Sequence, residues 1–185
     1  MTTSLDATCS AIVAGLKASG LNLLAIDFDQ TIVNIHTGGR WAGPLDELAG
    51  RIRPFFSKFI PLAVKEGVHV AVVTFSPQVN VIAGVLKHAF SEGVASKIPI
   101  RGNDNSWTYE GRGSRDGKQA HMASAAEEIG LKHNVEITRN TVILIDDDRN
   151  NIESALRNEV RAIWLDPDNP ERVVSNLCEL LGIAT

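Results

Sequence analysis

The chain has 185 residues, of which 44% are apolar and 22% are charged, and its net charge at neutral pH is −4. This length and composition are typical of a single globular domain with a sizeable core. The sequence has no strongly basic block, so binding to a nucleic-acid backbone is not expected. The mild negative charge does not exclude an anionic substrate, because a bound metal ion can reverse the local field.

The cysteine content and the apolar runs indicate a protein of the cytoplasm. Cys9 and Cys178 lie far apart and form no CxxC pair, so we expect reduced, unreactive thiols. No apolar run approaches the roughly 18–20 residues that a membrane span requires. No basic segment followed by an apolar core opens the sequence. We therefore predict a cytoplasmic location and no membrane segment.

Apolar periodicity, together with the positions of glycine and proline, predicts helices and strands that alternate along the chain. In chain order we expect a helix over 5–19, a strand over 23–28, a helix over 45–66 that breaks at Pro54 and Pro61, a strand over 68–73, a helix over 77–91, a short strand over 97–101, a helix over 118–133, a strand over 141–145, a helix over 150–158, a strand over 160–165 and a helix over 170–181. Glycine-rich segments over 32–44 and 102–117 are predicted to be loops.

Strands that alternate with helices indicate a mainly parallel sheet with helices on both faces. We therefore predict an α/β fold, a Rossmann-like three-layer sandwich, in one domain over residues 1–185 with its core over about 21–166. The 32–44 loop is expected to act as a flap. Neither this loop nor the 102–117 loop has room for a large insertion, so we predict no full cap domain.

The end of the first predicted strand carries the strongest chemical signal. The apolar run stops at Asp27 and Asp29, two carboxylates that are one residue apart. Two acids at the carboxyl end of a central strand lie where open α/β sheets bind ligands. They repel each other unless a cation or a proton separates them, and a divalent metal with oxygen ligands is the simplest solution.

Two further strands end in polar side chains that a parallel sheet brings to the same edge. Thr74 follows the second strand, and Asp146 and Asp147 follow the strand over 141–145. Lys118 begins the helix that lies between these strands in the sequence. The chain therefore gathers acids, a hydroxyl and an ammonium group at one rim.

Each of these groups has a use in phosphoryl transfer. Asp27 is a candidate nucleophile that would form an aspartyl phosphate, and Asp29 is a candidate acid and base. The Thr74 hydroxyl and nearby backbone N–H groups suit a phosphate oxygen. Lys118 would neutralise the nucleophile and the transferring group.

Four segments in this order resemble the four motifs of the haloacid dehalogenase superfamily. They are DFDQT at 27–31, Thr74 in VVTFS, Lys118, and IDDDRNN at 145–151. The resemblance covers roughly residues 23–165 and implies a Rossmann-like fold, Mg2+ dependence and, most often, phosphatase activity. It would assign Asp27 as nucleophile and Asp29 as acid and base. Gln30 departs from the glycine that is frequent at this position.

The resemblance also implies a metal shell. The backbone carbonyl of Asp29 would join Asp27 and Asp147 on the ion. The fourth motif is similar to the DDxxxN form of small, capless magnesium-dependent phosphatases. We take Asp146 and Asp147 as the pair at the site, because Asn151 then occupies the position of the asparagine in the DDxxxN form. From the next helical turn it can orient both acids.

We therefore expect a Mg2+-dependent phosphatase that hydrolyses a phosphomonoester, either a small phosphorylated metabolite or a phosphoprotein. The flap, or a neighbouring subunit of a homo-oligomer, would shield the site from water and recognise the leaving group of the substrate. The residues expected around the substrate are His36, Arg40, Trp41, Phe75, Ser76 and Asn151.

Other functions stay open at this point. A phosphotransferase or mutase would pass the phosphoryl group to a second hydroxyl, and a non-catalytic module would use the same rim to bind a partner. Carbon–halogen hydrolysis is less expected for this sequence, because that reaction does not require all the acidic residues that could bind a metal here. The segment over 111–118 suggests a phosphate loop, but Arg112 replaces the required glycine and Gln119 follows the lysine.

Several other polar and aromatic residues are given structural roles. Trp107 and Tyr109 either pack beneath the 102–117 loop, which we favour, or line the pocket, and Trp164 is expected to lie in the core. Asp148 is assigned to solvent or to a helix cap. Outside the flap, the histidines show no metal-binding spacing and are expected to be structural; they are His69, His88, His121 and His133.

Overall fold

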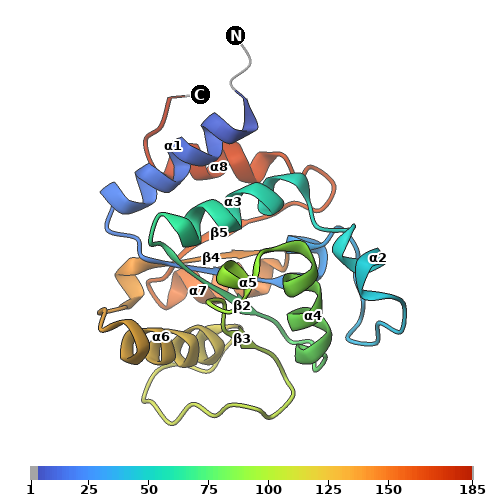
Figure 1. Ribbon diagram of the computed structural model, residues 1–185. Helices are drawn as coiled ribbons and strands as arrows, with labels where there is room; N and C mark the ends of the chain where they lie inside the picture. The colour runs from blue at the N-terminus through green and yellow to red at the C-terminus, as the bar shows by residue number, and fades with distance from the viewer. Residues whose placement is uncertain (1–3, 185) are drawn as a thin grey trace.

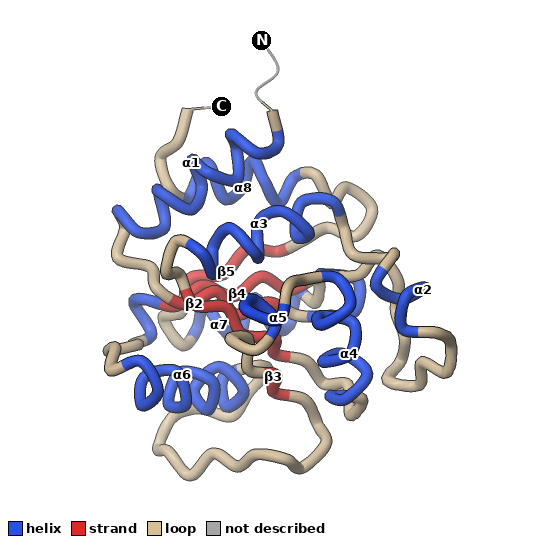
Figure 2. Tube along the Cα trace, viewed as in Figure 1, coloured by secondary structure: helices blue, strands red, loops and turns tan. Residues whose placement is uncertain are grey.

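Five parallel strands form one sheet in the spatial order β3-β2-β1-β4-β5. The computed structural model describes residues 4–184 and is shown as a ribbon in Figure 1 and by secondary structure in Figure 2. The strands are β1 (Leu23–Ile26), β2 (His69–Val73), β3 (Ile100–Arg101), β4 (Val142–Asp146) and β5 (Arg161–Trp164). The helices are α1 (Leu5–Ala18), α2 (Leu45–Ala49), α3 (Pro54–Lys65), α4 (Val79–Ala89), α5 (Glu92–Ala95), α6 (Gln119–His133), α7 (Arg149–Arg157) and α8 (Arg172–Leu180). The predicted α/β fold with a parallel sheet is confirmed.

Helices cover both faces of the sheet, as predicted for a three-layer sandwich (Figure 1). Side chains alternate along a strand, so β1 sends Leu24 and Ile26 into one core and Leu23 and Ala25 into another. The first core is shared with α1, α3, α4 and α8, and the second with α6 and α7. Every residue of β1 is buried, which fixes the position of the chain that leaves its end.

The predicted break at Pro54 is confirmed, whereas the predicted break at Pro61 is wrong. The segment over 45–66 forms α2 and then α3, which begins at Pro54, because the residue before a proline disfavours helical backbone. Arg53 accordingly has an extended backbone, with φ −63° and ψ 140°. Pro61 lies inside α3 and does not end it. The helix expected from residue 77 begins at Val79.

The second loop lies where the sequence predicts it, and the first begins two residues later than predicted, because Ile32 ends a turn and Val33 pairs with Ile52. Residues 34–44 and 102–117 contain no helix or strand. The first follows β1 and the second connects β3 to α6 (Figure 1). No helix in the described part of the chain combines the length and the apolar character that crossing a bilayer requires.

The first strand is shorter than predicted. It ends at Ile26, and Phe28–Ile32 forms a wide turn in place of further strand. The turn is closed by backbone hydrogen bonds, among them one of 3.0 Å from Val33 N–H to the carbonyl of Phe28. At its centre Gln30 has φ 56° and ψ −5°, in the left-handed region. Glycine reaches this region without a Cβ penalty, which explains why it is frequent at this position in the superfamily that the sequence resembles.

Substitution of Gln30 tests whether this backbone conformation is strained. Gln30→Gly should raise the free energy of unfolding by roughly 0.5 kcal/mol, because relief of Cβ strain slightly outweighs the added entropy of the unfolded chain. Gln30→Val should lower it by about 1–2 kcal/mol, because a β-branched residue tolerates this region least. Urea unfolding of the three proteins measures the ranking, and a valine variant as stable as the glycine variant would contradict the strain.

Candidate active site

The strand order brings three sequence motifs together at one edge of the sheet. β1 lies between β2 and β4 and is parallel to both. Asp27 follows β1, Thr74 follows β2, and Asp146 is the last residue of β4. Their side chains line one cavity of about 320 Å³. The predicted site residues that line it are Asp27, Asp29, His36, Thr74, Phe75, Ser76, Lys118, Asp146, Asp147 and Asn151.

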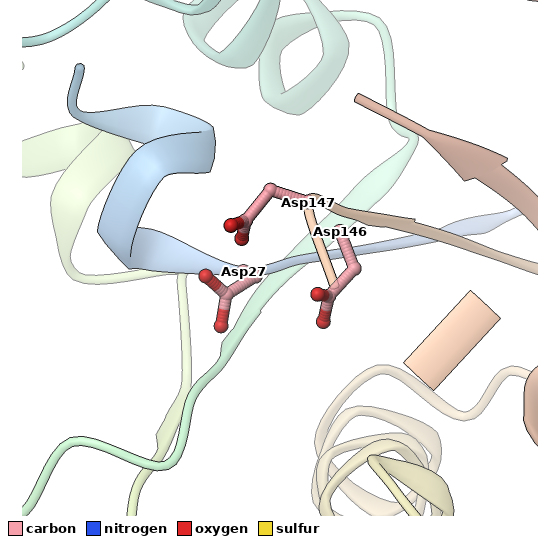
Figure 3. Close-up of side chains that lie close together, drawn as sticks. All are labelled: Asp27, Asp146 and Asp147. Atoms are coloured by element: carbon pink, nitrogen blue, oxygen red, sulfur yellow. The ribbon is translucent and has the colours of Figure 1, made fainter. Parts of the chain in front are cut away.

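Three carboxylates from two neighbouring strand ends converge in this cavity (Figure 3). Asp27, Asp146 and Asp147 each offer one oxygen, and these oxygens lie within 4.8 Å of one another. Asp27 and Asp146 are 6% and 1% exposed, whereas Asp147 is half-buried. The hydroxyl of Thr31 donates to Oδ1 of Asp147 at 3.2 Å. This spacing would allow the three side chains to share a cation.

The ammonium group of Lys118 is buried beside the acids. Its Nζ donates to Oδ1 of Asp27 at 2.7 Å and to the backbone carbonyl of Val73 at 3.0 Å. It also lies 3.9 Å from Oδ2 of Asp146. The ring of Phe75 lies on another side, with its centroid 4.1 Å from Nζ, a favourable cation–π arrangement. These partners replace the water that a buried ammonium group would otherwise need.

Burial has the largest effect on the protonation of the three acids. Removal from water raises the pKa of Asp27 to about 7, although Lys118 lowers it. Burial likewise raises the pKa of Asp146 to about 6, again against the effect of Lys118. The pKa of Asp147 is also raised by burial. Three carboxylates therefore face one ammonium group, and a bound cation would compensate the negative charge that remains.

The donor atoms fit a divalent metal such as Mg2+. Hard carboxylate oxygens are the ligands that Mg2+ and Ca2+ prefer, and the described cluster contains no cysteine or histidine. The side chain of Asp29 is not part of this cluster. The expectation that Asp29 contributes its backbone carbonyl stays a prediction.

Asp29 lines the same cavity, but its carboxylate is held by the predicted flap. The hydroxyl of Thr37 donates to Oδ2 of Asp29 at 2.8 Å, and the backbone N–H of Thr37 donates to the same oxygen at 3.0 Å. Nδ1 of His36 lies 3.5 Å from that oxygen. The cavity therefore contains a second acidic group, separate from the cluster that could hold a metal.

The turn after β2 presents two hydroxyl groups to the cavity. Oγ1 of Thr74 accepts a hydrogen bond of 3.1 Å from Ser76 N–H, and Oγ of Ser76 accepts one of 3.2 Å from Gln78 N–H. These bonds fix both side chains at the cavity wall. Phe75 lies between them in the sequence, and its 44% exposed ring offers the one large apolar surface among the described lining residues.

The segment after β4 holds the carboxylate of Asp146 in place. Nδ2 of Asn151 donates to both carboxylate oxygens of Asp146, at 3.1 and 3.0 Å. Asp148 is the N-cap of α7, and its side chain accepts from Asn150 N–H at 2.8 Å. Asn151 thus contacts Asp146, one of the two acids that it was expected to orient, and Asp148 caps the helix as expected.

The flap is attached to the start of α4 through the backbone of Trp41. Gln78 accepts a hydrogen bond of 2.6 Å from Trp41 N–H and donates one of 2.9 Å to the Trp41 carbonyl. The indole N–H donates to the carbonyl of Pro44 at 3.2 Å. Neither Trp41 nor the exposed Arg40 lines the cavity, so this arrangement does not bring these two predicted residues to the site, whereas it does bring His36 there.

Two residues outside the motifs support the backbone around the site. Arg53 donates to the carbonyls of Gln30 at 2.9 Å and Thr31 at 3.1 Å, which stabilises the wide turn. The indole N–H of Trp164 donates to the carbonyl of Asp147 at 2.7 Å. Trp164, which was predicted to lie in the core, packs against the second core but is only half-buried, because its N–H needs this polar partner. No sequence motif predicts either contact.

Aromatic rings link the loop before α6 to the cavity wall. The ring of His121 lies edge-on to Phe75 and to Trp107, with centroid distances of 5.4 and 4.7 Å. Its Nε2 lies 3.1 Å from Oδ1 of Asn103. Burial, with a further contribution from Lys118, lowers the pKa of His121 to about 4. The imidazole is therefore neutral near pH 7 and acts as a packing group, as predicted.

Comparisons with known proteins bear on the fold. No protein-family model matches the sequence, and a search of curated proteins gives no match. Among solved structures, the N-terminal part of the protein BF1531 from Bacteroides fragilis, described as containing a phosphatase domain complexed with Mg, is similar over 90% of this chain and 42% of its own, with 16% identity and a TM-score of 0.55. An uncharacterized protein from Corynebacterium glutamicum is similar over 89% of this chain and 98% of its own, with 17% identity and a TM-score of 0.50. The HAD domain of the effector protein Lem4 from Legionella pneumophila is similar over 87% of this chain and 97% of its own, with 13% identity and a TM-score of 0.45.

At these identities the likeness concerns the fold. The five-stranded parallel sheet, with the motifs at the ends of β1, β2 and β4, has the Rossmann-like arrangement predicted from the sequence, and the BF1531 domain is similar to it in fold. The chain spans 42% of the BF1531 chain, and the phosphatase description and the bound Mg belong to that protein.

Loss of one carboxylate should weaken metal binding. Asp147→Asn should lower the affinity for Mg2+ by about 10–100-fold, because it replaces one of three anionic ligands with a neutral group. Isothermal titration calorimetry with Mg2+ measures the change. Glu153→Gln, which neutralises an exposed acid of α7, is the control and should bind as the wild type does. Equal Mg2+ affinity for Asp147→Asn and the wild type would contradict the proposed ligand set.

His121 should make the folded protein less stable as the pH falls from about 6.5 towards about 4. In this window the unfolded chain binds a proton at this position and the folded chain does not. The loss should reach about 2 kcal/mol between pH 7 and pH 4.5. His121→Gln should lose that much less stability over the same range, as measured by urea unfolding at both pH values. An identical pH dependence for variant and wild type would show that the buried imidazole is not neutral.

Proposed function

We propose that this protein is a Mg2+-dependent phosphatase that hydrolyses phosphomonoesters through an aspartyl phosphate at Asp27. The observation that carries the proposal is the position of this carboxylate, which lies 2.7 Å from Nζ of Lys118 and within the three-acid cluster. A phosphoryl group in this cavity would approach a nucleophile whose charge is offset on one side by an ammonium group. Mg2+ bound by the cluster would neutralise phosphate oxygens and orient them for in-line attack.

In the first half-reaction, an oxygen of Asp27 attacks phosphorus opposite the leaving oxygen. The bond from phosphorus to the leaving group breaks, and protonated Asp29 gives its proton to the departing oxygen, so that an alcohol is released. Lys118 stays hydrogen-bonded to Asp27 and stabilises the charge on the transferring group. The hydroxyl of Thr74, fixed at the cavity wall, binds a phosphate oxygen.

In the second half-reaction, water attacks the phosphorus of the aspartyl phosphate. The carboxylate of Asp29 accepts a proton from that water, the bond from phosphorus to Asp27 breaks, and inorganic phosphate leaves. The hydrogen bonds from Thr37 support this role, because they hold the Asp29 carboxylate inside the cavity and apart from the metal cluster. One acid can then serve as nucleophile while its neighbour moves protons.

The cavity lining favours a particular kind of substrate. Lys118 is the only lysine or arginine among the described residues that line the cavity. A substrate with one phosphate group and an otherwise uncharged leaving group therefore fits better than a polyanion such as a nucleic acid. The exposed ring of Phe75 would contact an apolar part of the leaving group, in a small metabolite or in a phosphoprotein side chain. The likeness to a phosphatase domain complexed with Mg supports the proposal at the level of the fold.

Substitution of the two aspartates should separate their roles. Asp27→Asn should abolish phosphate release from p-nitrophenyl phosphate, because the carboxamide is not a nucleophile. Asp29→Asn should lower kcat by about 10²–10⁴-fold, the usual contribution of acid–base catalysis. Phosphate release is measured with Mg2+ and again with a chelator, which should stop the reaction in the wild type.

The control for this experiment is Glu153→Gln on the exposed face of α7, which should keep the wild-type rate. Phosphate release by Asp27→Asn at the wild-type rate would contradict the covalent mechanism. Transfer to an added alcohol in place of release into water would instead identify a phosphotransferase.

A further inference from the structure

A second cavity lies beside α6, between the loop that precedes this helix and the segment that follows it. Its volume is about 640 Å³, larger than that of the candidate active site. The loop over 102–117 arches beneath α6 in Figure 1 before the chain enters the helix. Tyr109 and Ser114 of this loop line the cavity together with Met122 and Ala126 of α6. Among the described residues, none lines both cavities.

Most of the cavity wall is apolar. Met122 is 4% exposed and forms part of the wall, as do Ala126, Val135, Ile137 and Val142. The volume falls within the range of roughly 300–1,000 Å³ that is typical of small-molecule sites. An apolar space of this size can bury the body of a small ligand, and such burial is favourable.

One buried polar group indicates which atoms a ligand must carry. Gln119 begins α6, lines the cavity and is 7% exposed. Its Nε2 is buried and has no hydrogen-bond partner among the described residues. A buried donor without a partner costs about 1–3 kcal/mol, so rotation of the amide that brings Nε2 to an oxygen of a bound molecule would stabilise the complex.

We propose that this cavity binds a small, mainly apolar molecule that carries a carboxylate or carbonyl oxygen at the end facing Gln119. The apolar wall buries the body of the molecule, and the Gln119 amide fixes its orientation. A small molecule fits better than a protein surface, because the unpartnered amide is more than nine-tenths buried. The site is independent of the phosphatase proposal.

Octanoate is a suitable probe, because it joins an apolar chain to a carboxylate. Met122 is one of only two methionines in the sequence. Labelling with [13C-methyl]methionine therefore gives an NMR signal from the cavity wall, which Met122→Leu assigns. We expect octanoate to shift the Met122 signal of the full chain with saturation at a single site.

Three variants test the location of the bound probe. Ala126→Phe should abolish the shift, because the ring projects into the cavity one helical turn from Met122 and obstructs binding there. Gln119→Leu should weaken octanoate binding about tenfold, through the loss of a hydrogen bond to a charged group. Ala18→Phe makes the same change as the first variant at an exposed position near the end of α1, and it should bind octanoate as the wild type does. Thermal unfolding confirms that each variant is folded.

Each contrary outcome overturns part of the proposal. No saturable shift at millimolar octanoate, or a shift that Ala126→Phe leaves intact, would overturn the site itself. Self-association of the wild type that Ala126→Phe abolishes would show that the cavity is an interface between copies of the chain. Unchanged affinity in Gln119→Leu would overturn the assignment of the ligand oxygen. Asp27→Asn should bind octanoate normally, which separates this site from the fate of the proposed activity.

Discussion

The buried contact between Lys118 and Asp27 is the interaction on which the candidate active site depends. Three carboxylates withdrawn from water repel one another, and burial of an uncompensated charge costs several kcal/mol. Nζ of Lys118 offsets part of this cost from 2.7 Å to Asp27 and 3.9 Å to Asp146. The Val73 carbonyl and the Phe75 ring complete its surroundings. The negative charge that remains on the three acids favours a bound cation. The proposed phosphoryl transfer would use the same cation.

The parallel sheet makes this contact possible. β1 is buried on both faces and lies between β2 and β4, so its end is the point where the groups from three strands meet. The chain then turns sharply, with Gln30 in the left-handed region and Arg53 bonded to the carbonyls of the turn. As a result, the carboxylate of Asp29 faces the flap, while that of Asp27 lies beside those of Asp146 and Asp147. Two acids that are one residue apart thereby come to lie in different surroundings.

The centre of the site was predictable from the sequence because strand ends of a parallel sheet share one edge. Asp27 and Asp146 follow from that rule alone. The supporting contacts were not predictable, because Thr37 and Gln78 act through a loop whose path depends on tertiary packing. The length of β1 was also overestimated, since Phe28 is apolar and buried as a strand residue would be, yet it lies in the turn. The fold is thus encoded in local patterns, whereas the arrangement of the flap depends on packing between distant segments.

Chemical trapping of the intermediate tests the central claim most directly. The protein would be mixed with p-nitrophenyl phosphate and Mg2+ and then treated with borohydride, which reduces an acyl phosphate to an alcohol and converts aspartyl phosphate to homoserine. Peptide mass spectrometry then locates the modified residue. The account predicts homoserine at position 27, in place of Asp27, only when substrate and Mg2+ are both present. Homoserine at another aspartate, or none while phosphate is being released, would contradict it.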